Sequence, residues 1–392
     1  MMKNRGSAWG RLRYAILIGS SIALLLQGEA QSASRGIWIS PEELQKRPTS
    51  GSAWSSLMEA AQASPGTAAV ANQDSKHDTA TLAMALAAVR TGRSDLRQKA
   101  VNALLDAIGT EEGARWLAIG RNLGAYVIAA DLLDMHADGN PSSPGSRIEA
   151  WLARFFTRTL RHNNSDRQIH FRDSAWSSGS NASAQEGFAY SALAAYLNRR
   201  DELDWSWTAF RRYAGDRSSP HKVSANDTSW QYIPSDPVGI QDPGAMKNGC
   251  RLDGAIANDM SRGGSFSCKP GFTQYPWVGL EGAVPAAIIL QRAGYPALDI
   301  VSEALKRAAD YLWHVREVTS NPSWFDGERS NEIVWLINMA YGLDYPFKGP
   351  AGNGRTVGWT DWSHDAESVR AGLPPKEDVP PPLAPRDLRI VP

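Results

Sequence analysis

The chain has 392 residues, of which 42% are hydrophobic and 21% charged, as in an ordinary globular protein with one large domain or two average ones. Its 41 basic residues equal its 41 acidic ones, which argues against a general nucleic-acid or membrane-surface binder, since such proteins usually carry a basic excess. The 15 Trp residues mildly favour a carbohydrate ligand, because sugar rings stack on indoles. Packing of these indoles in the core is the alternative.

The N-terminus has the parts of a secretory signal. Basic residues precede a short apolar run at 15–26, and Gly28-Glu29-Ala30 offers a small-x-small cleavage site. The run is too short to span a bilayer comfortably, and an uncleaved anchor is the alternative. We therefore expect residues 1–30 to be a signal peptide. The mature protein would be periplasmic or secreted, with no membrane contact after cleavage.

Apolar residues recur at helical spacing along most of the chain. Helices are predicted over residues 41–46, 52–63, 79–90, 95–108, 116–133, 148–160, 181–197, 201–213, 280–293, 298–315 and 331–341. With almost no strand signal, this pattern predicts an all-α fold, in which consecutive antiparallel pairs wind into an (α/α) toroid. The toroid domain would cover residues 31–372, and the Pro-rich residues 373–392 would form a tail.

Polar runs precede or interrupt several of these helices. They include residues 72–78, Arg121-Asn122, residues 176–183 and residues 248–277. A polar run at a helix N-terminus favours an anionic ligand, and an arginine in a buried helix needs a carboxylate partner from the protein or from a substrate. In a toroid the loops at one end form the cleft, so we expect these runs to meet there. Plain capped loops are the alternative.

The stretch between residues 215 and 273 shows no regular pattern, and a loop this long is usually functional. It carries the only two cysteines, Cys250 and Cys268. Pairing in an oxidising compartment would close a loop of about 19 residues and add roughly 3 kcal/mol of stability. Two free thiols are the alternative. Two cysteines without nearby histidines do not favour a metal site, and we expect neither metal nor cofactor.

Two kinds of glycosidic-bond cleavage need different residues. Hydrolysis needs two carboxylates across the bond, and the chain offers several without an evident pair (Asp74, Asp253, Asp259 and Glu281). Elimination on a uronic acid needs Asn, Arg or His donors that neutralise the carboxylate, and a group that transfers the C5 proton. Tyrosine can transfer this proton when a nearby cation lowers the pKa of its hydroxyl. The polar runs supply these residue types (His77, Arg121, Asn181, Arg262 and Tyr275). Zinc and nucleotide signatures are not found in the sequence.

Six segments taken together resemble the alginate-lyase-like polysaccharide lyases with an (α/α) toroid. They are NQDSKHDTATLAMAL (72–86), GRNLGAYVIAADLL (120–133), the helix from Asn181 with NRRDELDW after it (198–205), DGAIANDMSRGGSF…TQYPWVGLEGA (253–283), WLINMAYGLDYPF (335–347) and VGWTDW (357–362). The resemblance covers about residues 36–365. No single segment is diagnostic alone, but their common order and spacing are fairly specific.

The resemblance implies roles for particular residues. Asn181 matches the asparagine that neutralises the uronate carboxylate, and Tyr275 matches the tyrosine that acts as base, acid or both. Arg262 matches the arginine near that tyrosine, although its spacing to Tyr275 is longer than in the alginate enzymes. The family's histidine position is Ala182 here, which puts alginate itself in doubt as the substrate. His77 or His170 would have to supply that role from another loop, and we favour His77.

The resemblance thus implies a lyase that cleaves a polyuronate, alginate or a glucuronan-like chain, by metal-independent β-elimination. We expect a monomer whose partner is an anionic polysaccharide, with no nucleic acid. The residues expected to contact substrate are Lys76, Arg121, Asn122, Trp277, Trp359 and Trp362. A glycoside hydrolase using Asp253 and Glu281 on the same toroid is one alternative. A non-catalytic polysaccharide-binding or export protein is the other.

Overall fold

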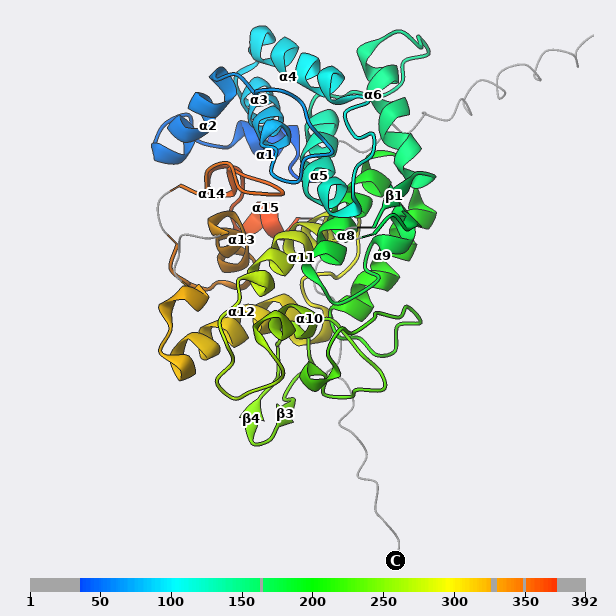
Figure 1. The fold of residues 1–392 in the computed structure, drawn as a ribbon. Coiled ribbons are helices and arrows are strands. Elements are labelled where there is room, and N and C mark those ends of the chain that lie inside the picture. The colour runs from blue at the N-terminus through cyan, green and yellow to red at the C-terminus, as the bar shows by residue number, and fades with distance from the viewer. Residues whose placement is uncertain (1–35, 163–164, 326–329, 348–349, 372–392) are drawn as a thin grey trace, which may run out of the picture. The chain divides into compact units, whose positions relative to one another are not determined.

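The computed structural model describes residues 36–371, except 163–164, 326–329 and 348–349. The expected signal peptide and the Pro-rich tail therefore lie outside the described residues. The chain divides into residues 1–32 and a unit of residues 33–392, which holds every element described below. This unit is mostly helical, which confirms the predicted all-α class (Figure 1). No helix in the described part is long and apolar enough to cross a membrane.

Fifteen α-helices and four short strands are assigned in the described residues. The helices are α1 (Pro41–Gln45), α2 (Ser52–Gln62), α3 (His77–Thr91), α4 (Ser94–Ala107), α5 (Trp116–Leu132), α6 (Pro144–Ala153), α7 (Phe171–Ser174), α8 (Asn181–Tyr196), α9 (Arg200–Tyr213), α10 (Ala257–Met260), α11 (Tyr275–Arg292), α12 (Ile300–Thr319), α13 (Asn331–Tyr341), α14 (Thr360–Ser363) and α15 (Ala366–Arg370). The strands form two antiparallel hairpins, β1 (Thr159–Arg161) with β2 (Gln168–His170) and β3 (Met246–Lys247) with β4 (Cys250–Arg251). Leu160 lies opposite Ile169 in the first hairpin, and Lys247 lies opposite Cys250 in the second.

The long helices pack on one another in the order in which they follow along the chain. Helix α3 contacts α5, α5 contacts α8, α8 contacts α11, and α11 contacts α13. Helices α4, α9 and α12 pack against α3, α8 and α11, respectively. All residues of α8 and nearly all of α5 and α11 are buried, as expected for helices that are apolar on every side. Figure 1 shows these buried helices at the centre of the unit.

Helices α8 and α11 approach each other closely enough to require a glycine. A Cβ atom on Gly282 would lie 2.4 Å from the backbone carbonyl carbon of Ala184, which is closer than atoms pack. This contact sets the first turns of α8 beside the first half of α11. Asn181 begins the former helix and Tyr275 begins the latter, so the close approach helps to bring these two residues to the same region.

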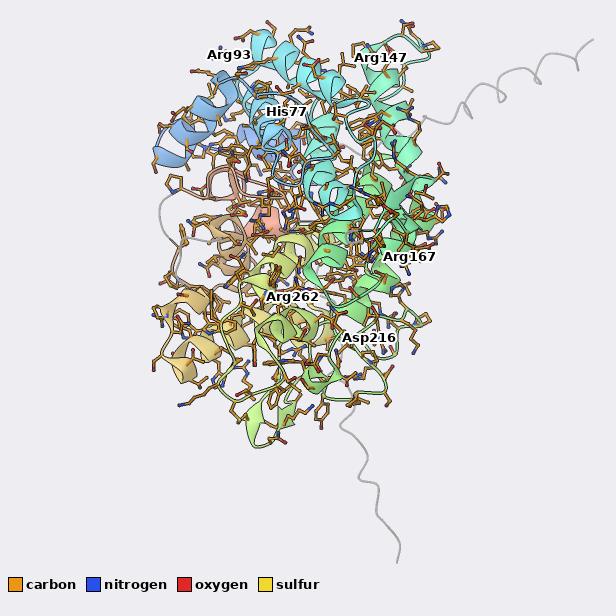
Figure 2. All side chains as sticks on the ribbon, in the orientation of Figure 1. His77, Arg93, Arg147, Arg167, Asp216 and Arg262 are labelled. Carbon is orange, nitrogen blue, oxygen red and sulfur yellow. A yellow bond between two sulfur atoms is a disulfide. The ribbon has the colours of Figure 1, made fainter. Side chains whose placement is uncertain are left out.

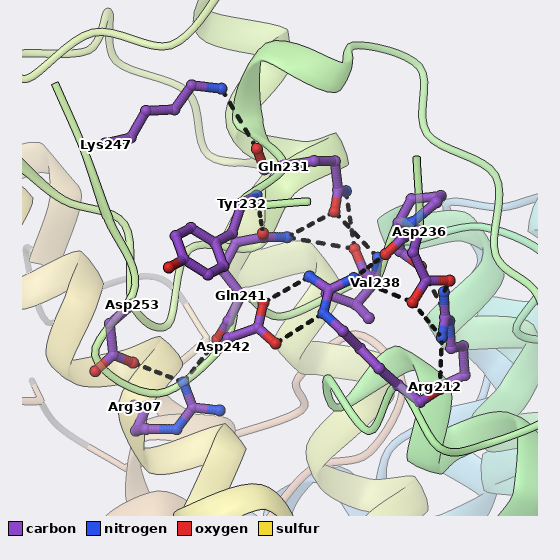
Figure 3. A network of polar contacts seen from close by, with 12 residues as sticks. Arg212, Gln231, Tyr232, Asp236, Val238, Gln241, Asp242, Lys247, Asp253 and Arg307 are labelled. Carbon is purple, nitrogen blue, oxygen red and sulfur yellow. Dashed lines mark hydrogen bonds and ion pairs between the residues drawn. The ribbon is translucent and has the colours of Figure 1, made fainter. Parts of the chain in front are cut away.

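The irregular segment between α9 and α11 is held by a polar network (Figure 3). Buried Arg212 pairs with Asp236, and Arg307 of α12 donates to Asp253 at 2.6 Å and to the carbonyl oxygen of Gln241 at 2.7 Å. The disulfide between Cys250 and Cys268 is formed, with a Cα–Cα distance of 5.6 Å, which confirms the predicted pairing. The long loop therefore has a defined conformation without much secondary structure.

Two predicted boundaries were wrong in informative ways. The predicted helix over 148–160 ends at Ala153, and Leu160 instead lies in β1, where it is the single buried residue of three. A three-residue strand contributes a single buried residue, and one apolar position does not distinguish the alternating pattern of a strand from the spacing of a helix. Helix α11 begins at Tyr275 rather than at residue 280, because Pro276 is compatible with the first turn of a helix.

Candidate active site

A cleft of about 730 Å³ lies where α5, α8 and α11 begin, beside the β1–β2 hairpin and α10. It includes four of the residues predicted from the sequence, namely Arg121, Asn181, Arg262 and Tyr275. Its full lining is Gln73, Arg115, Trp116, Leu117, Arg121, His162, Arg167, Ile169, Asp173, Ser177, Ser178, Ser180, Asn181, Ala182, Ser224, Asn226, Arg262 and Tyr275. Segments far apart in the sequence therefore meet in one hollow.

Asn181 is the first residue of α8, and Asp259 of α10 holds it in place. The backbone N–H and the side-chain Nδ2 of Asn181 donate to the same carboxylate oxygen of Asp259, at 3.0 and 2.9 Å. Burial raises the pKa of Asp259 to about 7, although the Asn181 hydrogen bonds and the charge of Arg262 oppose this shift. The carboxylate acceptor orients the amide so that Nδ2 is the donor. One of its two hydrogens remains for a ligand.

Tyr275 and Arg262 are in direct contact. The guanidinium carbon of Arg262 lies 4.6 Å from the centroid of the Tyr275 ring, within the range of a cation–π interaction. Tyr275 is half-buried, whereas Arg262, which follows α10, is exposed (labelled in Figure 2). A cation therefore contacts the phenol ring in the cleft that Asn181 also lines.

Arg121 lies in the buried part of α5 and meets its need for polar partners within the protein. Its Nε donates to Oε1 of Gln185 at 3.2 Å, and Nη1 lies 3.7 Å from a carboxylate oxygen of the exposed Asp74. Burial and the nearby Arg355 lower the pKa of Arg121. An arginine nevertheless stays charged in proteins, so the group contributes a positive charge to the cleft wall.

The cleft carries an excess of positive charge. Four arginines line it (Arg115, Arg121, Arg167 and Arg262), against one aspartate, Asp173. Figure 2 labels Arg167 and Arg262, which come from the β1–β2 hairpin and from the segment after α10. His162 also lines the cleft, with its ring centroid 4.7 Å from that of Trp116. No spacing in the sequence singled this histidine out.

The two histidines considered from the sequence lie elsewhere. His77 is 2% exposed at the start of α3, and its Nδ1 lies 2.7 Å from the hydroxyl oxygen of buried Tyr126. Burial lowers the pKa of His77, opposed by the charge of Asp106. His170 is exposed and does not line the cleft. Neither histidine lines the cleft that contains Tyr275.

Three further predicted substrate contacts are placed in the interior. Asn122 donates through Nδ2 to the carbonyl oxygens of Val70 and Asn72, at 2.9 and 2.7 Å, so it anchors the loop before α3. Trp359 and Trp362 are 1% and 2% exposed and offer no surface to a sugar. The structure therefore gives these three residues packing and anchoring positions. The sequence signal was ambiguous because Trp359 and Trp362 follow an irregular segment.

A second hollow of about 570 Å³, the Glu281 pocket, contains the remaining predicted contacts, Lys76 and Trp277. It is lined by Lys76, Gln274, Trp277, Val278, Glu281, Ser330, Asn331, Glu332, Pro350, Ala351, Gly354 and Arg355. Glu281 accepts a hydrogen bond from the Ser330 hydroxyl at 2.7 Å and lies 3.7 Å from Nε of Arg355. Burial and the charge of Glu281 raise the pKa of Glu332, so the buried pair favours keeping a proton.

The carboxylate pair expected for a hydrolase is not assembled from Asp253 and Glu281. Asp253 is bound to Arg307 and accepts from the backbone N–H of Gly244 at 2.9 Å, and it lines neither hollow. Glu281 instead has Glu332 as its carboxyl neighbour. Within the described residues, no group of three or more His, Cys, Asp or Glu side chains is arranged to hold a metal ion.

Comparison with known proteins adds nothing to this geometry. No family model, no curated protein and no solved structure matches the chain.

Proposed function

We propose that this protein is a polysaccharide lyase that cleaves a uronate-containing chain, alginate or a glucuronan-like polymer, by β-elimination. The supporting observation is the meeting of Asn181, Arg121, Arg262 and Tyr275 in one positively charged cleft. These residue types can act on three features of a uronate substrate, namely its carboxylate, the proton to be removed and the leaving oxygen. The resemblance noted in the sequence points to the same chemistry.

The proposed reaction begins with neutralisation of the uronate carboxylate. The remaining hydrogen of the Asn181 amide and the guanidinium of Arg262 donate to it, with Arg121 adding positive charge from the cleft wall. Tyr275 then removes the C5 proton. The electrons of the C5–H bond form the C4–C5 double bond, and the C4–O bond breaks as Tyr275 passes the proton that it has taken from C5 to the leaving oxygen. Because protein groups neutralise the carboxylate, we propose that the reaction needs no metal ion.

We further propose that the helices form an incomplete (α/α) toroid. The sequential contacts from α3 through α5, α8 and α11 to α13, with α4, α9 and α12 packed against α3, α8 and α11, support this arrangement.

The disulfide between Cys250 and Cys268 supports an oxidising compartment, and we propose that the protein is periplasmic or secreted after signal cleavage. We propose that the protein acts as a monomer.

The decisive experiment follows ultraviolet absorbance during incubation with polymannuronate, polyguluronate, glucuronan and a glycosaminoglycan, each with and without chelator. A rise that chelator leaves unchanged would indicate an unsaturated product. Tyr275→Phe should reduce this rate by at least about 10²-fold with the fold intact. Tyr232→Phe is the matched control, since Tyr232 is exposed in the long loop, and it should keep wild-type activity. Retained activity in Tyr275→Phe would refute the assignment.

One observation favours a second function, a glycoside hydrolase. Glu281 and Glu332 form a buried pair in which one member holds a proton, as an acid and a base for hydrolysis would require. This reading predicts new reducing ends without ultraviolet absorbance, and loss of activity in both Glu281→Gln and Glu332→Gln. Binding of a polysaccharide without any new ends would instead indicate a non-catalytic binding or export protein.

A further inference from the structure

We propose that the substrate is a heteropolysaccharide in which a uronate, bound in the cleft, is linked to a neutral, hydroxyl-rich sugar bound in the Glu281 pocket. This inference rests on the proposed lyase function and narrows its substrate class. It follows from the contrast between two adjoining hollows, one rich in cations and the other lined by buried carboxyl groups.

The two hollows are neighbours because the same two segments line both. Gln73 lines the cleft and Lys76 lines the Glu281 pocket, while Tyr275 lines the cleft and Gln274 the pocket. Side-chain contacts also link them. Arg121 of the cleft donates to Gln185, and Nε2 of Gln185 lies 3.4 Å from a carboxylate oxygen of Glu281. A chain that crosses Tyr275 would therefore extend from one hollow into the other.

The charges of the two hollows differ. Four arginines and one aspartate line the cleft, and although Arg121 lies 3.7 Å from Asp74, the exposed Arg167 and Arg262 add positive charge that a uronate can meet. The Glu281 pocket has two cations, Lys76 and Arg355, against two glutamates. Arg355 lies 3.7 Å from a carboxylate oxygen of Glu281, and Lys76 donates to the carbonyl oxygen of Gly354 while its charge acts on Glu332. A second uronate in this pocket would have to compete with Glu281 and Glu332 for these two cations.

The carboxyl groups of the pocket suit sugar hydroxyls. Glu281 and Glu332 are 5% and 4% exposed, so an approaching carboxylate would be brought into a poorly solvated site next to a negative charge. Sugar hydroxyls, in contrast, can both donate to and accept from a pair of carboxyl groups that holds a proton. The pair therefore offers an acceptor and a donor to a neutral ring and disfavours a uronate.

The test compares two polymers built on the same uronate, a homopolyuronate and one that alternates the uronate with a neutral sugar. For the wild-type protein, kcat/KM from ultraviolet absorbance should be at least tenfold higher on the alternating polymer. Glu281→Gln should reduce this ratio at least fivefold, because the repelling charge is removed. Arg355→Ala should increase the ratio, because the charge of Glu281 loses its partner. Glu367→Gln, a surface substitution on α15, should leave the ratio unchanged.

Equal or better use of the homopolyuronate by the wild-type protein would overturn the inference, as would an unchanged ratio in both pocket variants. If either pocket variant fails to fold, the other decides, because they are expected to act in opposite directions. Absence of absorbance on both polymers would refute the lyase function. The inference is then decided by calorimetric titration with saturated octasaccharides of the two polymers. At least tenfold tighter binding of the alternating octasaccharide supports it, and equal or undetectable binding overturns it.

Discussion

Asn181 and Asp259 are joined by two hydrogen bonds to a single carboxylate oxygen, from the backbone N–H and from the side-chain amide of Asn181. The other oxygen of Asp259 has no hydrogen-bond partner among the described residues, and it faces Gly279 of α11 and the hydroxyl of Tyr213. Asp259 thus connects the start of α8 to α10 and α11 and orients the amide that lines the cleft. We regard it as a positioning residue.

The first prediction concerns the pH dependence of stability. The pKa of Asp259 is about 7 in the folded protein and near 4 in an unfolded chain, so the folded state binds this proton more tightly. The contribution of Asp259 to stability should therefore fall as pH rises from about 4 to 7 and then level off. In Asp259→Asn this contribution is absent. The difference in unfolding free energy between the two proteins should change by about 2 to 3 kcal/mol between pH 5 and pH 8.

Urea unfolding of both proteins at the two pH values measures this change. Asp201→Asn is the control, because Asp201 is exposed on α9, and it should leave the pH dependence of the wild-type protein unaltered. A pH dependence of Asp259→Asn identical to that of the wild type would show that the carboxyl does not titrate in this range.

The second prediction concerns Gly279, which makes room for Asp259. A Cβ atom at this position would lie 2.5 Å from the unpaired oxygen of Asp259, so Gly279→Ala forces the carboxylate or the helix to move. We expect a loss of about 1 to 3 kcal/mol in urea unfolding. In the background of Asp259→Gly the obstructing carboxylate is absent, and the same substitution should cost much less. An equal loss in both backgrounds would place the clash elsewhere.

Much of the fold was predictable because a long segment that is apolar on every side forms a helix in the protein interior. The starts of α5 at Trp116 and of α8 at Asn181 agree with the sequence prediction, and both helices are apolar on nearly every side. Residues such as Arg121 and Asn181 stood out for the same reason. A polar side chain in or beside an apolar helix needs a partner or a ligand, and this requirement is visible without coordinates.

The partners themselves were not predictable. Asp259 was one of several acidic residues in a loop, and only the tertiary contact with Asn181 distinguishes it. His77 could not be judged either, because a histidine in the first turn of a helix is exposed or buried according to what packs over it, here Tyr126 of α5. His162 and Glu332 likewise gain significance from neighbours far away in the sequence.

The third prediction assigns a substrate contact to His162. Its ring lies tilted against that of Trp116 in a cleft that four arginines also line, so we expect a sugar bound there to meet its N–H. His162→Gln should raise KM about tenfold with a smaller effect on kcat, as for loss of one hydrogen bond to a charged or strongly polar group. His170→Gln is the matched control, since His170 is exposed and outside the cleft lining, and it should keep the wild-type KM. Equal KM values in the two variants would remove His162 from the site.

The fourth prediction concerns the disulfide, which closes a segment that contains both Asp259 and Arg262. Replacing Cys250 and Cys268 by Ser should lower the unfolding free energy by about 3 kcal/mol, because the unfolded chain gains freedom. The same change loosens the segment that orients Asn181 through Asp259 and carries Arg262, which contacts the Tyr275 ring. We therefore expect kcat/KM to fall as well, at temperatures where the variant is fully folded. Reductant should reproduce both effects in the wild-type protein and cause no further change in the variant. If activity stays at the wild-type level while stability falls, the polar network around Arg307 and Asp253 is sufficient to hold the segment, and the disulfide serves stability alone.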